Sequence, residues 1–373
     1  MQKISLMMII SSFVLLSLMM IGCSYGKAAW YNYPDYKDSK RFHKIEIDET
    51  QNSFQFEKSE IDYGNLLKFD DWTNLDAAFR PLSDIIKNHK TAAFVLIKND
   101  TILYEEYFNG FNEDSKLTSF SVAKSFVSSM IGIAIDEGCI KSVDQAITEF
   151  IPELNKKEGF EKITLSHLLN HTSGLKQSYI LAGQMYYGKD IWKAVNKLKM
   201  DAEPGVHQQY HNMNTQLLGI VIERASGKCV SEYLKEKIWD PIGAEYSAYW
   251  STDKGQFEKA FCCINAAARD YAKFGRLMLH RGNWEGNQLI SEEWVSQSLK
   301  RDTTNGSGWA YNKSWYLGLE RYKDFMAIGL YKQFIYVCPE KDIVIVRFGE
   351  REKVAHEERL GWTRIFRQIV DQL

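Results

Sequence analysis

The segment over residues 122–137 constrains the fold most, because it is predicted to be a helix with apolar residues on nearly all of its faces. Gly138 follows it as a C-terminal stop. A helix without a polar face has to be covered by other elements, so we expect a buried central helix. Hydrophobic residues make up 45% of the chain, which is enough for a core around it. The apolar positions are Val122, Phe126, Val127, Met130, Ile131, Ile133, Ala134 and Ile135.

Strand patterns occur on both sides of this helix in the sequence. Residues 91–107 are typical of a β-hairpin, with strands at 92–97 and 102–104 and a turn at Asn99-Asp100. The hairpin precedes the central helix, so a sheet at the start of the domain has to be completed by strands from elsewhere.

The completing strands are predicted far along the chain, at 334–337 and 343–348, and an amphipathic helix follows at about 357–372. The residues from about 142 to 299 are mostly helical in pattern. We therefore predict an α/β (α+β) fold: an antiparallel sheet built from both chain ends, flanked by helices and carrying a mostly helical insertion.

The first residues are typical of an export signal, in which Lys3 precedes an uncharged, mostly apolar run over 4–21. Residues 20–23 resemble the bacterial lipoprotein box, where a small residue precedes a Cys that is lipidated. We predict a signal peptide over 1–22 and a lipid on Cys23. This places the protein in the bacterial cell envelope, anchored to a membrane on its periplasmic or extracellular face. The alternative is an uncleaved anchor helix, which also puts the rest of the chain outside the cytoplasm.

The remaining chain is expected to hold one catalytic unit. Residues 23–50 are polar and aromatic without a clean period, so we predict a tether or a loosely packed arm. Residues 51–373 are predicted to form a single domain, with the helical subdomain at about 142–299. The formal net charge of -2 gives no global positive field, which argues against a nucleic-acid partner.

The cysteines do not indicate a disulfide framework. Six Cys residues are too sparse for a disulfide scaffold, and one of them is the predicted lipid anchor. Cys262 and Cys263 are adjacent, and neighbouring cysteines rarely pair for geometric reasons. We expect these two to be small buried residues with free thiols.

Ser121 and Lys124 carry the candidate chemistry, because they open the buried helix with a spacing of three residues. That spacing places the amine over the hydroxyl. Burial disfavours the charged form of Lys124, so its amine is a candidate base for activating Ser121 without a histidine. The alternative is a capping Ser and a surface Lys, which the apolar character of the helix disfavours.

Two further side chains are candidates, Tyr210 and Asn212, which lie between a predicted turn and an apolar helix. The phenol of Tyr210 can relay a proton between nucleophile and leaving group, and the amide of Asn212 can position Lys124 and a substrate carbonyl. Taken alone, these residues are better explained by a capping Asn beside a packed Tyr. His167 and His171 are four apart, but Leu168 stands where a metalloprotease motif needs Glu, so we predict no metal site and no cofactor.

The motifs together resemble the serine beta-lactamase-like, penicillin-recognising hydrolases, in their class C and esterase branch and close to the nylon-oligomer (6-aminohexanoate-dimer) hydrolase group. Ser121-Val122-Ala123-Lys124 resembles the family's nucleophile helix, and Tyr210-His211-Asn212 resembles its Tyr-x-Asn element. Residues 168–175 resemble a structural segment of the family, and 265–279 resemble a later helix of the nylon-oligomer group.

The resemblance implies a role for each residue. Ser121 is then the acylated nucleophile, Lys124 its base or orienter, and Tyr210 the proton shuttle, while Asn212 helps to position the substrate. The backbone N–H of Ser121 forms half of the oxyanion hole. The other half comes in the family from a strand with Lys-Thr-Gly or His-x-Gly.

That third motif is absent from this sequence. The corresponding stretch over 327–333 keeps Gly329, so the N–H of Leu330 is expected to complete the oxyanion hole, but no cation or imidazole occupies the usual place. Lys332 is either a displaced positive charge or a solvated lysine. This departure disfavours turnover of β-lactams or D-alanyl peptides.

We therefore expect an exported, membrane-tethered serine hydrolase that works through an acyl-enzyme on a small-molecule or peptide-like ester or amide. One alternative is a cell-wall D,D-peptidase or a class C-like beta-lactamase. A second is a non-catalytic surface binding protein on the same fold. The sequence leaves the oligomeric state and the physiological substrate open.

Overall fold

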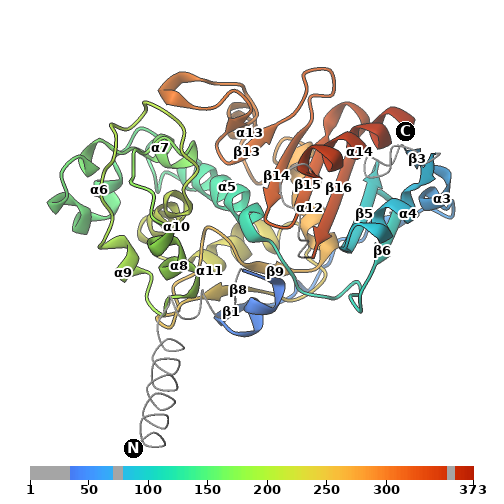
Figure 1. The fold of residues 1–373 in the computed structure, drawn as a ribbon, viewed down its shortest axis with the longest axis horizontal. Coiled ribbons are helices and arrows are strands. Elements are labelled where there is room, and N and C mark those ends of the chain that lie inside the picture. Colours follow the sequence, from blue (N-terminus) through green and yellow to red (C-terminus); the bar gives the residue numbers. More distant parts are fainter. Residues whose placement is uncertain (1–33, 70–78, 351–357) are drawn as a thin grey trace, which may run out of the picture.

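An eight-stranded sheet supports one end of the molecule, in the order β12-β13-β14-β15-β16-β5-β6-β2 (Figure 1). The structure is a computed structural model and describes residues 34–69, 79–350 and 358–373. The predicted signal peptide at 1–22 and Cys23 lie outside these residues. The strands are β2 (Glu57–Lys58), β5 (Thr91–Lys98), β6 (Thr101–Tyr107), β12 (Tyr311–Asn312), β13 (Trp315–Leu317), β14 (Phe325–Gly329), β15 (Gln333–Cys338) and β16 (Ile343–Gly349).

The two ends of the chain meet in the middle of this sheet. β16 pairs antiparallel with β5, so that Val346 lies opposite Val95. The predicted hairpin is confirmed as β5 and β6, and its turn residues Asn99 and Asp100 have positive φ angles of 49° and 57°, as a tight hairpin turn between twisted strands requires. The predicted antiparallel sheet built from both chain ends is confirmed, and it has one parallel edge, where the short strand β2 pairs with β6. This edge strand is reached by a long connection rather than a tight turn, which permits the parallel direction.

Alternation along the strands divides the core into two layers. Val95 and Ile97 of β5 face one cluster, whereas Phe94 and Leu96 face the other, since successive side chains of a strand point to opposite faces. The first face is covered by α12 (Ala268–Leu279), which packs on β15 and β16. The second face is covered by α4 (Leu82–Asn88) and α14 (Glu358–Gln372).

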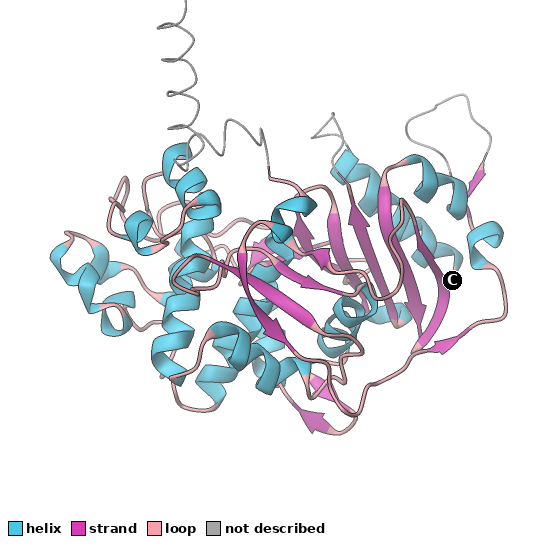
Figure 2. Cartoon of the chain, turned by 90° about the horizontal axis from the view of Figure 1, so that it is seen from below, coloured by secondary structure: helices cyan, strands magenta, loops and turns pink. Residues whose placement is uncertain are grey.

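The predicted central helix is α5 (Ala123–Asp136), preceded by the 3-10 turn η2 (Phe120–Val122). Every residue of α5 from Ala123 to Ala134 is buried. Figures 1 and 2 show α5 between the sheet and the helical end of the molecule. The helices at that end are α6 (Ile147–Phe150), α7 (Leu165–Leu169), α8 (Tyr179–Tyr187), α9 (Trp192–Val195), α10 (Asn212–Ser226) and α11 (Val230–Leu234).

A second sheet has the order β1-β8-β9-β7, and its strands β8 and β9 come from the region predicted to be mostly helical. Its strands are β1 (His43–Ile47), β7 (Leu117–Thr118), β8 (Ala248–Thr252) and β9 (Ile264–Ala266). The prediction of a loosely packed arm is wrong for residues 36–47, because the 3-10 turn η1 (Tyr36–Lys40) and β1 belong to the folded body. β1 pairs antiparallel with β8, with Ile45 opposite Trp250.

No helix within 34–69, 79–350 and 358–373 combines the length and the apolar character needed to cross a membrane.

Candidate active site

Ser121 stands where a sharp turn passes into the central helix. It lies in η2, and the preceding residue Phe120 has a positive φ of 43°. Such a conformation is uncommon for a non-glycine residue and marks a constrained backbone. Phe120 is held by its ring contact with Tyr331, with centroids 5.5 Å apart. The turn leaves Ser121 partly exposed while its neighbours Phe120 and Val122 are buried.

Lys124 lies one helical turn later, directly beside the Ser121 hydroxyl. Its Nζ atom is 2.9 Å from Ser121 Oγ and donates a hydrogen bond of 2.7 Å to the backbone carbonyl of Phe261. The side chain is 1% exposed, and this burial lowers the pKa of the amine well below its usual value. No carboxylate forms an ion pair with Lys124 in the described part of the chain. A neutral amine in this position can accept the hydroxyl proton.

Tyr210 covers the other side of the Lys124 amine. The Lys124 Nζ atom is 5.1 Å from the centre of the Tyr210 ring. The ring also packs on His171, with centroids 4.4 Å apart, and on Tyr311 at 6.4 Å. Tyr210 is 39% exposed, so one part of the side chain faces solvent while the other faces the amine.

Asn212 is the first residue of α10, and its side chain does not cap the helix. The cap is His211, whose side chain accepts a hydrogen bond from Met213 N at 3.1 Å. Asn212 Oδ1 is buried and has no hydrogen-bond partner among the described residues. The hydrogen bonds of Lys124 go to Ser121 and Phe261 rather than to Asn212. A buried amide oxygen without a partner is a costly arrangement that a substrate N–H would relieve.

Leu330 follows β14, whose end lies against the nucleophile turn. A Cβ atom at Gly329 would stand 2.4 Å from the backbone oxygen of Ser119, so only glycine permits this approach. Within the described chain, neither the Ser121 N–H nor the Leu330 N–H donates a hydrogen bond to another residue. The expectation that these two N–H groups form the oxyanion hole stays a prediction. Lys332, two residues later, has a positive φ of 66°, and its carbonyl accepts from Arg347.

The two histidines considered for a metal have separate structural partners. His167 Nδ1 accepts a hydrogen bond from Thr164 N at 3.1 Å, inside the capping box of α7. His171 Nδ1 accepts from His211 N and lies 3.2 Å from Asn214 Nδ2. Among the described residues no group of three or more His, Cys, Asp or Glu side chains is arranged to hold a metal ion.

The expectation of free thiols at Cys262 and Cys263 is wrong. The two form a disulfide, and both residues are buried. The Cα atoms of the pair have the ordinary spacing of neighbouring residues, 3.7 Å, and Cys263 adopts a left-handed backbone, with φ of 71°. The Phe261 carbonyl that binds Lys124 directly precedes this bridge. Sequence reasoning missed this carbonyl, since a backbone acceptor carries no residue-type signal.

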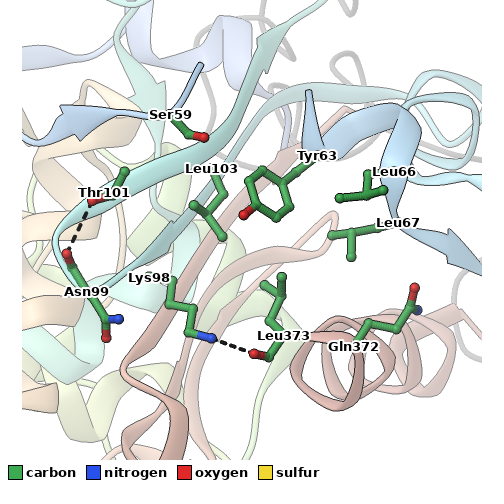
Figure 3. Close-up of a pocket in the computed structure, with 10 residues that line it drawn as sticks. All are labelled: Ser59, Tyr63, Leu66, Leu67, Lys98, Asn99, Thr101, Leu103, Gln372 and Leu373. Atoms are coloured by element: carbon green, nitrogen blue, oxygen red, sulfur yellow. Dashed lines mark hydrogen bonds between the residues drawn. The ribbon is translucent and has the colours of Figure 1, made fainter. Parts of the chain in front are cut away.

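A cavity of about 780 Å³ lies elsewhere on the molecule and does not include these residues. It opens between β5, β6 and the C-terminal helix (Figure 3). Tyr63, Leu66 and Leu103 form apolar parts of its wall, and Lys98 Nζ donates to the carbonyl of Leu373 at 2.5 Å. This contact fastens Leu373 to the sheet, so the polar groups in the wall of the cavity have a structural role.

Comparisons with known proteins agree with this arrangement. A family model described as Beta-lactamase matches residues 75–368. The chain is 26% identical over 305 residues to a 6-aminohexanoate-dimer hydrolase of Paenarthrobacter ureafaciens, covering 74% of this chain and 77% of that protein. It superimposes with a TM-score of 0.81 on a Bacillus anthracis structure described as a "putative 6-aminohexanoate-dimer hydrolase", at 25% identity and covering 91% and 94% of the two chains. A family VIII carboxylesterase shares the fold, with a TM-score of 0.62 at 16% identity over 78% of this chain and 95% of that one.

Proposed function

Because the chain belongs to the beta-lactamase family and is a serine hydrolase of that family, we propose that it cleaves an ester or amide bond through an acyl-enzyme at Ser121. The observation that carries the proposal is the 2.9 Å approach of Lys124 Nζ to Ser121 Oγ in a buried setting. A serine hydroxyl is a weak nucleophile until a neighbouring base takes its proton.

The first half of the reaction forms the acyl-enzyme. The Ser121 proton passes to the neutral amine of Lys124 while Oγ attacks the substrate carbonyl. The negative charge that develops on the carbonyl oxygen is stabilised by the N–H groups of Ser121 and Leu330. Tyr210, next to the Lys124 amine, then gives its phenol proton to the leaving amine or alcohol and takes up from Lys124 the proton that came from Ser121, so that the amine is neutral again. Water attacks the acyl-enzyme in the second half and releases the acid.

We propose a linear amide as the preferred substrate class, with simple esters as accessory substrates. The name of the Paenarthrobacter ureafaciens relative supports an amide, because a dimer of 6-aminohexanoate is joined by one. The unpaired Asn212 Oδ1 supports it as well, since an amide offers an N–H donor and an ester does not. The missing Lys-Thr-Gly or His-x-Gly element argues against β-lactams and D-alanyl peptides.

We also propose that the enzyme is exported and tethered to a membrane by a lipid on Cys23. The lipoprotein-like residues 20–23 support this, and the Cys262–Cys263 disulfide is compatible with an oxidising compartment outside the cytoplasm. Incorporation of a labelled fatty acid tests it: wild type is expected to be labelled and recovered with membranes, whereas Cys23→Ala is expected to be neither. Equal labelling of the two proteins would contradict the anchor.

A fluorophosphonate probe tests the nucleophile. Wild type is expected to be labelled and Ser121→Ala is not. Ser128→Ala is the matched control, because Ser128 lies on the same helix and its buried Oγ has no partner among the described residues. Labelling of Ser121→Ala at the wild-type rate would refute the assignment.

Substrate choice is tested by turnover of three compounds, the 6-aminohexanoate dimer, p-nitrophenyl acetate and nitrocefin. We expect hydrolysis of the dimer and of the ester, and little hydrolysis of nitrocefin. Rapid nitrocefin hydrolysis would favour the beta-lactamase alternative. A protein that neither reacts with the probe nor turns over any of the three would favour a binding protein.

A further inference from the structure

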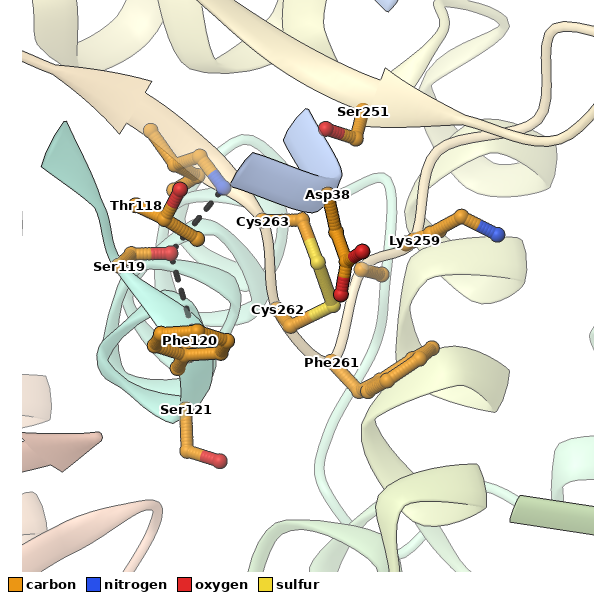
Figure 4. The surroundings of a disulfide bond; sticks show 12 residues. Asp38, Thr118, Ser119, Phe120, Ser121, Ser251, Lys259, Phe261, Cys262 and Cys263 are labelled. Atoms are coloured by element: carbon orange, nitrogen blue, oxygen red, sulfur yellow. Dashed lines mark hydrogen bonds between the residues drawn. A yellow bond between two sulfur atoms is a disulfide. The ribbon is translucent and has the colours of Figure 1, made fainter. Parts of the chain in front are cut away.

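The Lys124 amine is held by a carbonyl that stands at the edge of the Cys262–Cys263 disulfide. Phe261 O accepts the 2.7 Å hydrogen bond from Lys124 Nζ, and the bridged pair follows immediately in the chain. Figure 4 shows the disulfide beside the segment that carries Ser119, Phe120 and Ser121. The position of the amine therefore depends on the backbone of a loop that contains a reducible bond.

The loop also contacts the nucleophile turn directly. Ser119 N donates to the Ile264 carbonyl at 2.8 Å, and Ile264 N donates to Ser119 Oγ at 3.1 Å. Ile264 is the residue after the bridge, and Ser119 stands two residues before Ser121. The residue before the bridged pair, Phe261, thus binds Lys124, and the residue after it, Ile264, binds the turn that carries Ser121.

Hydrogen bonds hold the loop on both sides of Phe261, and the bridge adds to them. Gln216 of α10 accepts from Ala260 N at 3.1 Å and donates to the Glu258 carbonyl at 2.9 Å. The peptide group that carries the Phe261 carbonyl is held by Cys262 N, which donates to the Lys259 carbonyl at 2.9 Å, and the next carbonyl, of Cys262, accepts from Trp250 Nε1 at 2.7 Å. The bridge closes a small ring that includes their shared peptide bond, which restricts both residues.

Cys263 shows why this restriction matters. Its φ of 71° lies in the left-handed region, which a non-glycine residue adopts only at a cost in free energy. Opening the ring removes one of the restraints on this conformation and leaves the hydrogen bonds that the Cys263 carbonyl accepts from Ser251 N and Asn265 Nδ2. A relaxation of Cys263 would turn the adjoining peptide groups, and with them the carbonyl that binds Lys124.

Resting on the proposed function, we propose that the Cys262–Cys263 disulfide is a positioning element for Lys124 and Ser121, and that opening it slows acylation without weakening substrate binding. The oxidation state of this pair then sets the reactivity of the nucleophile. The buried Asp38 of η1 also lies among the residues that surround the bridge (Figure 4).

The redox step is a two-electron reduction. A water-soluble phosphine attacks one sulfur and the S–S bond breaks. Water supplies the oxygen of the phosphine oxide and the two protons, so that both cysteines become thiols. Oxidation by a disulfide compound reverses the change, forming the S–S bond again while the added disulfide becomes two thiols.

The test compares oxidised protein, phosphine-reduced protein and the Cys262→Ala/Cys263→Ala variant, with an ester substrate. We expect kcat to fall by about 10- to 100-fold in the two forms without the bridge, while KM stays within about 2-fold. Alkylation and mass measurement show which thiols are free, and reoxidation is expected to restore kcat. Wild-type kcat in either bridge-free form would overturn the inference.

Two controls separate this inference from other causes. Cys139→Ala/Cys229→Ala removes free cysteines, and it is expected to keep wild-type kcat and the same response to phosphine. The bridge-free variant is expected not to respond to phosphine at all. If that variant fails to fold, the reversible response of wild type decides. If the oxidised wild type is not labelled at Ser121 by the fluorophosphonate, the proposed function itself fails.

Discussion

The rings of His171 and Tyr210 pack on each other with their centroids 4.4 Å apart. This contact places a fully buried imidazole behind the proposed proton shuttle. His171 Nδ1 accepts from His211 N in the turn that positions Tyr210. The imidazole thus supports both the ring and the backbone of Tyr210.

His171→Phe is expected to lower the free energy of unfolding by about 1–3 kcal/mol at pH 7.5, because it leaves buried donors without an acceptor. The size of this loss should depend on pH. Burial lowers the pKa of His171 well below 6.5. The unfolded chain therefore binds a proton before the folded one does, and wild type loses stability as the pH falls below about 6.5. Because phenylalanine does not titrate, the gap between the two proteins should narrow towards pH 5.

Urea unfolding at pH 7.5 and pH 5 measures this gap. His207→Phe is the control, since His207 is exposed, and it should match wild type at both pH values. A gap that is constant with pH would contradict the neutral state of His171.

Lys124→Met should abolish labelling by the fluorophosphonate and yet make the protein more stable at pH 7, by about 1 kcal/mol. The folded chain holds Lys124 with a lowered pKa, whereas the unfolded chain protonates it near pH 10.5. The lowered pKa therefore reduces the free energy of unfolding of wild type at any pH below the pKa of the unfolded chain. At pH 7 this loss is present in wild type and absent in Lys124→Met, because methionine does not titrate.

Thermal unfolding between pH 6 and pH 10 checks the sign. Wild type should gain stability relative to Lys124→Met as the pH rises. Lys254→Met, which changes an exposed lysine, should parallel wild type throughout. A Lys124→Met protein that still reacts with the probe would exclude the amine as the base.

Asn212→Ala and Asn214→Ala should separate substrate binding from folding. Asn212 Oδ1 has no partner among the described residues, so its loss should leave stability within about 0.5 kcal/mol and lower kcat/KM for an amide about 10-fold. Asn214 is bonded to Ser173 Oγ at 2.7 Å and lies 3.2 Å from His171 Nδ1, so its loss should destabilise the fold. Amide kinetics and urea unfolding of both variants provide the measurement. Unchanged amide turnover in Asn212→Ala would show that the oxygen does not meet the substrate.

Gly329→Ala should displace the proposed oxyanion hole by pushing the end of β14 away from the nucleophile turn. The new methyl group would lie 2.4 Å from the Ser119 carbonyl oxygen, and a backbone atom cannot turn aside as a side chain can. We expect a loss of about 1–3 kcal/mol in stability together with a lower kcat. At Gly255 the nearest atom to an added Cβ is Asp253 Oδ1 at 3.3 Å, so Gly255→Ala serves as the control. Equal kcat and stability in the two variants would mean that β14 does not press on the nucleophile turn.

Local patterns in the sequence were sufficient to predict that Ser121 and Lys124 lie side by side. Ser121 and Lys124 are three residues apart on one helix, so their approach follows from helical geometry alone. The strands of the main sheet carry strong apolar signals, and the sheet they form was predicted from both chain ends. Roles for Tyr210, Asn212 and Leu330 remain predictions that rest on a resemblance to the family.

Features that depend on distant parts of the chain were not predictable. The arm over 36–47 has a weak pattern of its own and becomes ordered by pairing with β8. The bridge between Cys262 and Cys263 depends on a left-handed backbone at Cys263. Contacts of the surrounding loop stabilise this conformation, and no local sequence motif predicts it. The carbonyl of Phe261 meets Lys124 across a wide separation in sequence.

The pairing of β5 with β16 has a consequence for how the protein comes to be folded. Lys98 lies opposite Ile343, so the central pair of the main sheet forms only after nearly the whole chain has been synthesised. Closing so long a loop is slow, and until it closes the apolar strand β5 is an unpaired edge that other chains can join. The enzyme should therefore need to be kept unfolded, by chaperones or by transport as an extended chain, until its last strand has arrived. Loss of β16 alone would leave a chain that has every proposed catalytic side chain and no scaffold to hold them.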